Sequence, residues 1–123
     1  MNINTIKAAI VNVKHYSGDV FDLNISITNS DDTVYSLAGK TLLMQVKKKK
    51  TSSTALAELT TPTEIVIGGT SNNEIQCNKV IALAEGVYYY DIQNITDSVT
   101  LVKGTFEEEY DVTRVEATTT AAP

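Results

Sequence analysis

The chain has 123 residues, a formal net charge of −5 at pH 7, 42% hydrophobic residues and 20% charged residues. This length and composition are those of one globular domain, and they exclude a disordered chain. The acidic net charge argues against a general role in nucleic-acid binding, because binding of phosphates needs a basic face. No apolar run approaches the roughly 20 residues of a membrane-spanning helix, and a single cysteine excludes an intrachain disulfide.

Apolar and polar residues alternate with a period of two along much of the chain. Residues 20–28, VFDLNISIT, put apolar side chains on one face and polar side chains on the other, which predicts a half-buried strand. Similar patterns predict further strands over residues 41–47, 63–69, 72–78, 86–93 and 98–112. Turn-forming residues separate these segments at roughly ten-residue intervals, which is typical of an all-β sandwich or barrel.

One segment is a helical candidate. Residues 79–86, KVIALAEG, end in a glycine that could cap a helix, but so short a segment allows a strand equally well. We therefore expect at most one short helix, near residues 79–85. A single domain is predicted over residues 1–114. Residues 115–123, VEATTTAAP, have almost nothing to bury and predict a flexible Thr/Ala-rich tail.

Residues that could carry catalysis or bind a metal are scarce. His15 is the only histidine and precedes a Ser-Gly-Asp turn, so we expect it in a loop or at a strand edge rather than as a catalytic base. Cys77 lies on a predicted inward face beside Ile75, where a free cysteine behaves as a small buried hydrophobe. Neither residue completes the ligand set of a structural zinc site. We expect no enzymatic activity, no metal site and no cofactor.

Lysines and tyrosines are the candidate contact residues in the middle of the chain. Four consecutive lysines lie where a strand is predicted to end: Lys47, Lys48, Lys49 and Lys50. They could contact phosphate or an acidic partner surface, although a solvated strand end that discourages edge pairing also accounts for them. In the tyrosine triplet at residues 88–90, the first and third side chains are predicted to face the core and Tyr89 to face outward. Tyr89 is therefore the best single contact candidate.

Three consecutive carboxylates lie within GTFEEEYDVTR, residues 104–114. In a strand, Glu107 and Glu109 share a face that we expect to meet solvent or a partner, and Glu108 points the other way. The predicted inward face also holds the apolar side chains of this segment: Phe106, Tyr110 and Val112.

Four motifs in this order resemble a known module. They are a Gly-Asp at residues 18–19 that opens a long alternating strand, a Leu-Ala-Gly at 37–39, GVYYYDI at 86–92 and GTFEEEYDVTR at 104–114. Their order and spacing resemble a small β-sandwich of tailed-bacteriophage structural proteins, as in the N-terminal domains of baseplate upper proteins and in related tail and head-associated modules. The resemblance covers roughly residues 16–114. It implies an Ig-like antiparallel β-sandwich of about seven to nine short strands.

The resemblance also implies a function. The chain would be a non-enzymatic virion structural protein, present in many copies, that decorates or connects parts of the tail or baseplate, the neck or the capsid. Its partners would be other virion proteins and copies of itself, with no nucleic acid and no membrane, and it would be assembled into virions in the cytoplasm of a bacterial host. The candidate interface residues are Lys47, Lys48, Lys49, Lys50, Tyr89, Glu107, Glu108, Glu109 and Arg114.

Glu108 departs from the resemblance, because similar modules usually carry valine or a comparable residue at this position. A lone buried carboxylate is costly. The strand could bulge and turn Glu108 outward, Glu108 could pair with a cation such as Arg114 or a lysine, or it could face a neighbouring subunit. Our hypothesis is that this segment forms an edge or interface strand.

Two other functions are consistent with parts of the sequence. A carbohydrate-binding module for host surface glycans could use exposed tyrosines such as Tyr89, but the chain has no tryptophan and only two phenylalanines. A hydrolase could use Glu107 and Glu109 as paired carboxylates, but such pairs flank a cleft and one carboxylate sits in an apolar pocket. A solvated strand face supplies neither condition.

Overall fold

The structure is a computed structural model, and it describes residues 8–110. These residues form nine strands in two sheets and contain no helix. The larger sheet contains β1 (Ala9–Ile10) and β2 (Val13–Tyr16), which both pair with β9 (Val99–Glu109), followed by β8 (Gly86–Asn94), β4 (Leu42–Lys47) and β5 (Ala57–Thr60). The smaller sheet contains β3 (Val20–Ser26), β7 (Glu74–Val80) and β6 (Ile65–Gly68).

The strand order is that of an immunoglobulin-type sandwich. In such sandwiches, strands B, E and D pair in one sheet, and strands G, F, C and C′ pair in the other. The order β3-β7-β6 matches the first set and β9-β8-β4-β5 matches the second, with every strand in the same chain order. The expected all-β, Ig-like sandwich is therefore confirmed, and the strand count lies within the expected range.

A tyrosine near the start of β8 strengthens this assignment. The Tyr88 hydroxyl donates a hydrogen bond of 2.7 Å to the carbonyl oxygen of Ala84, four residues upstream. Immunoglobulin domains carry the same corner at the start of strand F, two residues before a disulfide cysteine. Tyr90 takes that cysteine's place here, and its hydroxyl bonds to the carbonyl oxygen of Val11 at 2.7 Å. Hydrogen bonds from two tyrosines thus tie β8 to neighbouring segments.

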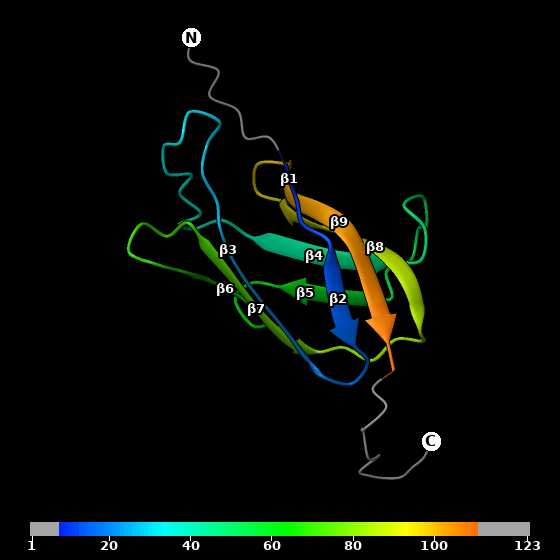
Figure 1. Cartoon of the computed structure of the whole chain (residues 1–123). Coiled ribbons are helices and arrows are strands. Elements are labelled where there is room, and N and C mark those ends of the chain that lie inside the picture. The colour runs from blue at the N-terminus through cyan, green and yellow to red at the C-terminus, as the bar shows by residue number, and fades with distance from the viewer. Residues whose placement is uncertain (1–7, 111–123) are drawn as a thin grey trace.

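β9, the last strand of the described chain, pairs with the two N-terminal strands as well as with β8. It pairs antiparallel with β8 along one side and parallel with β1 and β2 along the other. Figure 1 shows β2 (blue) and β9 (orange) side by side with their arrowheads at the same end. The sandwich is therefore not wholly antiparallel, and β9 is not an edge strand within the described domain. Of the two alternatives for residues 104–114, the edge strand is wrong for the described residues, and the interface strand stays a prediction.

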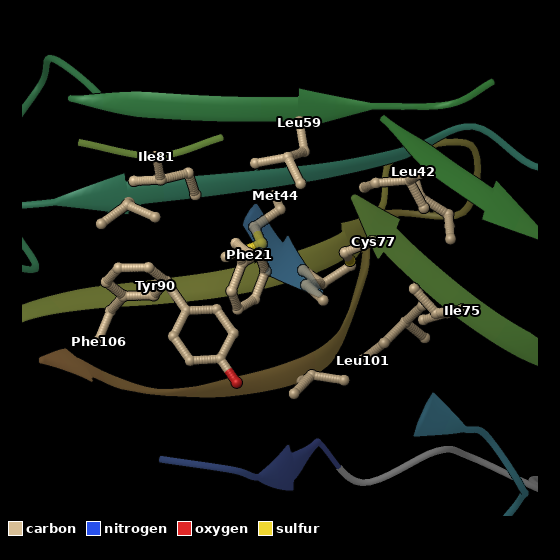
Figure 2. Close-up of a cluster of buried hydrophobic side chains, with 14 of the residues drawn as sticks. Phe21, Leu42, Met44, Leu59, Ile75, Cys77, Ile81, Tyr90, Leu101 and Phe106 are labelled. Carbon is tan, nitrogen blue, oxygen red and sulfur yellow. The ribbon is translucent and has the colours of Figure 1, made fainter. Parts of the chain in front are cut away.

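Side chains from both sheets fill one core between them (Figure 2). From the larger sheet, β4 contributes Leu42, Met44 and Val46, which are fully buried. From the smaller sheet, Phe21 and Cys77 are also buried, as the alternation in their strands predicts. Burial raises the pKa of the Cys77 thiol to about 12, which keeps it as an un-ionised apolar side chain.

A glycine allows the N-terminal strands to pack closely on β9. A Cβ atom at Gly104 would lie 2.2 Å from the carbonyl oxygen of Val11, far inside contact distance. The backbone N–H of Val11 donates to the carbonyl of Lys103 at 2.9 Å, and the side chain of Asn12 accepts a hydrogen bond from the N–H of Thr105 at 3.1 Å. Gly104 therefore lets residues 11–12, which connect β1 to β2, pack closely against β9.

Some sequence expectations differ from the structure. Residues 79–86 form the end of β7, an irregular segment and the first residue of β8. Tyr110 is 59% exposed rather than inward-facing, because β9 ends one residue earlier at Glu109. Val112, Arg114 and the predicted tail lie outside the described residues.

Candidate functional site

A groove of about 540 Å³ crosses the outer face of the larger sheet, over β1, β9, β8 and β4. Most of its side chains point away from the core, and cross-strand pairing sets them in rows. One row places Asp91 of β8 between Gln45 of β4 and Lys103 of β9. The adjacent row contains Lys47, Tyr89 and Thr105. The groove is therefore built on regular strands, which hold these side chains at fixed spacings.

Three lysines line this groove: Lys47, Lys50 and Lys103. Within residues 8–110, none of the three forms an ion pair. The ammonium nitrogen of Lys50 lies 5.4 Å from the centroid of the Tyr89 ring, a distance at which the ring face attracts a cation. Lys50 thus covers one face of Tyr89 and brings its charge to the groove from the β4–β5 connection.

Asp91 is the carboxylate of the groove. Burial raises the pKa of Asp91 above its ordinary value of 3.8, while the charge of Lys47 and a hydrogen bond from Gln93 act in the opposite direction. The Gln93 side-chain amide lies 3.5 Å from Asp91 Oδ2. Three lysines against one aspartate give the lining a formal charge of +2 in a chain whose net charge is −5.

A second polar cluster lies on the opposite, inward side of β9. Glu108 is 1% exposed and His15 is 6% exposed, and parallel pairing of β2 with β9 puts the two residues directly opposite each other. Glu108 Oε1 bonds to His15 Nδ1. Glu108 Oε2 accepts a hydrogen bond of 2.9 Å from the backbone N–H of Leu83. Both carboxylate oxygens are therefore satisfied, as burial requires.

Both ring nitrogens of His15 form hydrogen bonds inside the domain. Its Nε2 lies 3.0 Å from the carbonyl oxygen of Asp19, an acceptor only, so Nε2 carries a proton. A further proton then lies between Nδ1 and the Glu108 carboxylate, held by one or the other. The imidazole ring packs against the rings of Phe21 and Phe106, with centroids 6.0 and 5.5 Å away. With both nitrogens engaged inside the domain, the pair joins β2, β9 and the residues that follow β7.

Glu108 is thus buried with a partner, but the partner differs from those expected. The expected partners were a cation such as Arg114 or a lysine, or a neighbouring subunit, and Arg114 lies outside the described residues. His15 lies in the edge strand β2, as expected, yet its side chain faces the core. The β-bulge in β9 lies between the partners of Ile92 and Gln93, away from Glu108, so it does not turn the carboxylate outward.

The other predicted contact residues separate into two groups. Lys47, Lys50 and Tyr89 come together in the groove. Lys48 lies instead over the Tyr88 ring, 4.7 Å from its centroid, and Lys49 lies in the turn after β4. Glu107 and Glu109 lie further along β9, where Lys14 forms an ion pair of 3.4 Å with Glu109.

Several groove residues were not predicted as contacts. They are Ile10, Asn12, Leu43, Gln45, Asp91, Gln93, Lys103 and Thr105. Asp91 could have been found, because it alternates with the inward tyrosines exactly as Tyr89 does along the strand. Lys103 could not, since its place beside Asp91 depends on the β8–β9 register. Within residues 8–110, no group of three or more His, Cys, Asp or Glu side chains could hold a metal ion, and no helix is long and apolar enough to cross a membrane.

Comparisons with known proteins add a fold likeness alone. No protein-family profile matches the chain, and no curated protein matches it. One solved structure that it resembles is described as "Parallel homodimer structures of the extracellular domains of the voltage-gated sodium channel beta4 subunit explain its role in cell-cell adhesion". The identity is 11% and the TM-score 0.43, over 90% of this chain and 100% of that chain. The strand order and the groove by themselves define the class of the protein, an Ig-like β-sandwich with a hollowed, lysine-lined sheet face.

Proposed function

We propose that the chain is a non-enzymatic structural protein of a bacteriophage virion, present in many copies and acting through protein–protein contacts. The observation that carries this proposal is the groove, in which Lys47, Lys50 and Tyr89 meet on the face of the β9-β8-β4-β5 strands. Regular strands make a rigid platform, and a rigid platform loses little conformational entropy on binding. The resemblance of four sequence motifs to those of phage β-sandwich modules supports the viral setting.

Copies of the chain would each contribute a modest interface to the particle. Many weak contacts acting together give a large combined affinity when geometry allows them to form at once. The proposal covers decoration or connection of the tail or baseplate, the neck or the capsid, with other virion proteins and copies of itself as partners. No nucleic acid, membrane or cofactor takes part.

Mass spectrometry of virions purified from the phage or prophage that encodes the chain tests this proposal. We expect peptides of the chain in the particle at many copies, in a fixed ratio to the capsid or tail proteins. Absence from highly purified particles, with the protein present in the infected-cell lysate, would contradict a virion role. Cross-linking within the same particles would identify the neighbouring proteins.

A carbohydrate-binding module is the second candidate. Amide side chains of the groove, at Asn12, Gln45 and Gln93, are of the kind that bind sugar hydroxyls, and Tyr89 lies among them. The position of Lys50 over the Tyr89 ring argues against this function, because stacking of a sugar needs a free aromatic face. Glycan-array binding that disappears in Tyr89→Ala would favour this candidate over the structural one.

A further inference from the structure

We propose that the lysine-lined groove binds an acidic, extended peptide segment of a partner protein. The proposal relies on the proposed function for the protein nature of the partner, and it adds the chemistry of that partner and the place where it binds. The groove is lined by Lys47, Lys50 and Lys103, and within the described chain these three have no carboxylate in an ion pair.

Charge is the first argument. Two lysines outside the groove are neutralised locally, since Lys14 pairs with Glu109 at 3.4 Å and Lys40 with Asp97 at 3.0 Å. The groove lysines instead gather around a single aspartate in an otherwise acidic protein. Such a concentration of uncompensated positive charge in a concave site attracts carboxylates and orients them.

The position of Asp91 sharpens the charge argument. It lies in the same row as Lys103, and its partial burial opposes ionisation. Asp91 is the one carboxylate of the groove lining, and it faces three lysine ammonium groups. Its position on β8 holds it at the surface of the sheet. Carboxylates of an incoming chain would meet the lysines from the open side of the groove, and Asp91 would repel them.

Apolar groups favour a peptide over an acidic polysaccharide. Ile10 is 71% exposed at one side of the groove, and Leu43 lines it on β4. Apolar side chains of a peptide can cover Ile10 and Leu43, whereas an acidic polysaccharide has no aliphatic side chains that could pack against them. Lys50 also occupies the face of Tyr89, where a sugar ring would otherwise stack. Lysines supplied by β4, β9 and the β4–β5 connection suit a ligand long enough to cross several strands.

Fluorescence anisotropy with the purified full chain tests the proposal. The probe is a fluorescein-labelled peptide, Glu-Leu-Glu-Ser-Glu-Leu, and the reference peptide carries lysine in place of each glutamate. We expect the acidic peptide to bind and the basic one not to bind. Affinity should fall as ionic strength rises, because salt screens exposed charges.

Two triple variants with the same net charge locate the binding site. Lys47→Gln with Lys50→Gln and Lys103→Gln removes the groove lysines and should weaken binding by about 10-fold or more. The control replaces three lysines outside the groove, Lys14→Gln with Lys40→Gln and Lys49→Gln, and should weaken it by less than about 3-fold. Equal losses in both variants would mean general charge attraction and would overturn the proposal.

A gain-of-binding variant gives an independent check. Asp91→Asn removes the competing carboxylate and keeps the side-chain size, so affinity for the acidic peptide should rise by about 3-fold. No change, or a loss, would contradict the role assigned to Asp91.

Stronger binding of an oligogalacturonate than of the peptide, with the same dependence on the groove lysines, would assign the site to acidic glycans and overturn the peptide proposal. Mass spectrometry of virions tests the proposed function separately. If the virion contains the chain but the purified protein does not bind the acidic peptide, the peptide proposal is wrong and the proposed virion role stands.

Discussion

Glu108 shows how a single residue can depart from the pattern of its strand. The alternation of β9 requires an inward side chain at this position, and the protein places a carboxylate there. The cost of burying it is offset by His15 across the strand pair and by the N–H of Leu83. Neither contact is visible in the local sequence, since His15 lies 93 residues away.

Removing one partner of this pair should be strongly destabilising. Glu108→Ala leaves the imidazole and the Leu83 N–H buried without an acceptor, and we expect the free energy of unfolding to fall by about 3 kcal/mol. Glu108→Gln keeps an oxygen for the Leu83 N–H and should lose less. Urea denaturation followed by circular dichroism measures both.

The double variant distinguishes a coupled pair from two independent residues. His15→Leu together with Glu108→Leu replaces the pair by apolar groups, which is often nearly neutral in buried sites. We therefore expect the double variant to be more stable than the sum of the single losses implies, by at least about 1 kcal/mol. Additive losses would show that the two side chains act separately.

Tyr90 links the pH dependence of stability to one hydrogen bond. Burial raises the pKa of Tyr90 from 10.0 to about 12, so the folded state favours the neutral phenol. Its contribution is fully present below pH 10 and is lost as the pH rises through about 12. Tyr90→Phe removes the bond to Val11 and should lower stability by about 1 kcal/mol at neutral pH.

Comparison of wild type and Tyr90→Phe at alkaline pH provides the check. Between pH 10 and about 12, wild type should lose more of its unfolding free energy than the variant loses. Cys77, whose pKa is also raised by burial to about 12, contributes to the slope in both proteins. Parallel stability curves would exclude a contribution from the Tyr90 phenol.

At the scale of elements, strands with a clean alternation were predictable and strands without one were not. β3, β4, β6, β7, β8 and β9 were expected close to their observed ranges. β1 has two residues, β5 buries only Leu59, and β2 presents a histidine where an apolar residue would mark the inward face. β1 and β2 owe their place to β9, which is far away in the chain, whereas β5 pairs with β4, the strand that precedes it.

Gly104 tests how much the N-terminal strands contribute. Gly104→Ala would push a methyl group into the Val11 carbonyl, displace residues 11–12 and break the Tyr90–Val11 hydrogen bond. We expect a loss of more than about 2 kcal/mol. Hydrogen exchange should become faster in β1 and β2 than in β3 or β7.

Gly68→Ala is the matched control, because Gly68 also lies in a strand and the atom nearest to its added Cβ would be the side-chain amide nitrogen of Gln76, at 2.7 Å. That side chain can rotate away, so the loss should be small. A Gly68→Ala loss as large as that of Gly104→Ala would show that glycine content in strands, not close approach to Val11, governs the effect.

At the scale of the whole molecule, one core connects both sheets, so the described domain should unfold as a unit. We expect the far-ultraviolet dichroism of the strands and the near-ultraviolet dichroism of the buried tyrosines to change at the same urea concentration. Two separated transitions would indicate that the sheets unfold independently, against the prediction of a single domain.

The groove was predictable only in part. Exposure of Tyr89 and of the lysine run follows from alternation and composition, and Tyr89, Lys47 and Lys50 do line the groove, whereas Lys48 and Lys49 do not. The hollow itself depends on how β1 lies against β9 and on the register of β8 with its neighbours. Local sequence patterns specify neither the packing of β1 against β9 nor the register of β8, and Asn12, Lys103 and Thr105 were therefore not expected in the groove.

The parallel pairing of β2 with β9 has a consequence for biosynthesis. Val13 pairs with Phe106 and Tyr16 with Glu109, so a ribosome must release nearly the whole described domain before these partners can meet. Closing so long a loop is entropically costly and slows folding. Until β9 emerges, β8 lacks its neighbour on that side and β2 has no partner strand within the described domain. Nascent chains on one messenger would then expose matching strand edges to each other, and exchange of β9 between them would give a domain-swapped dimer.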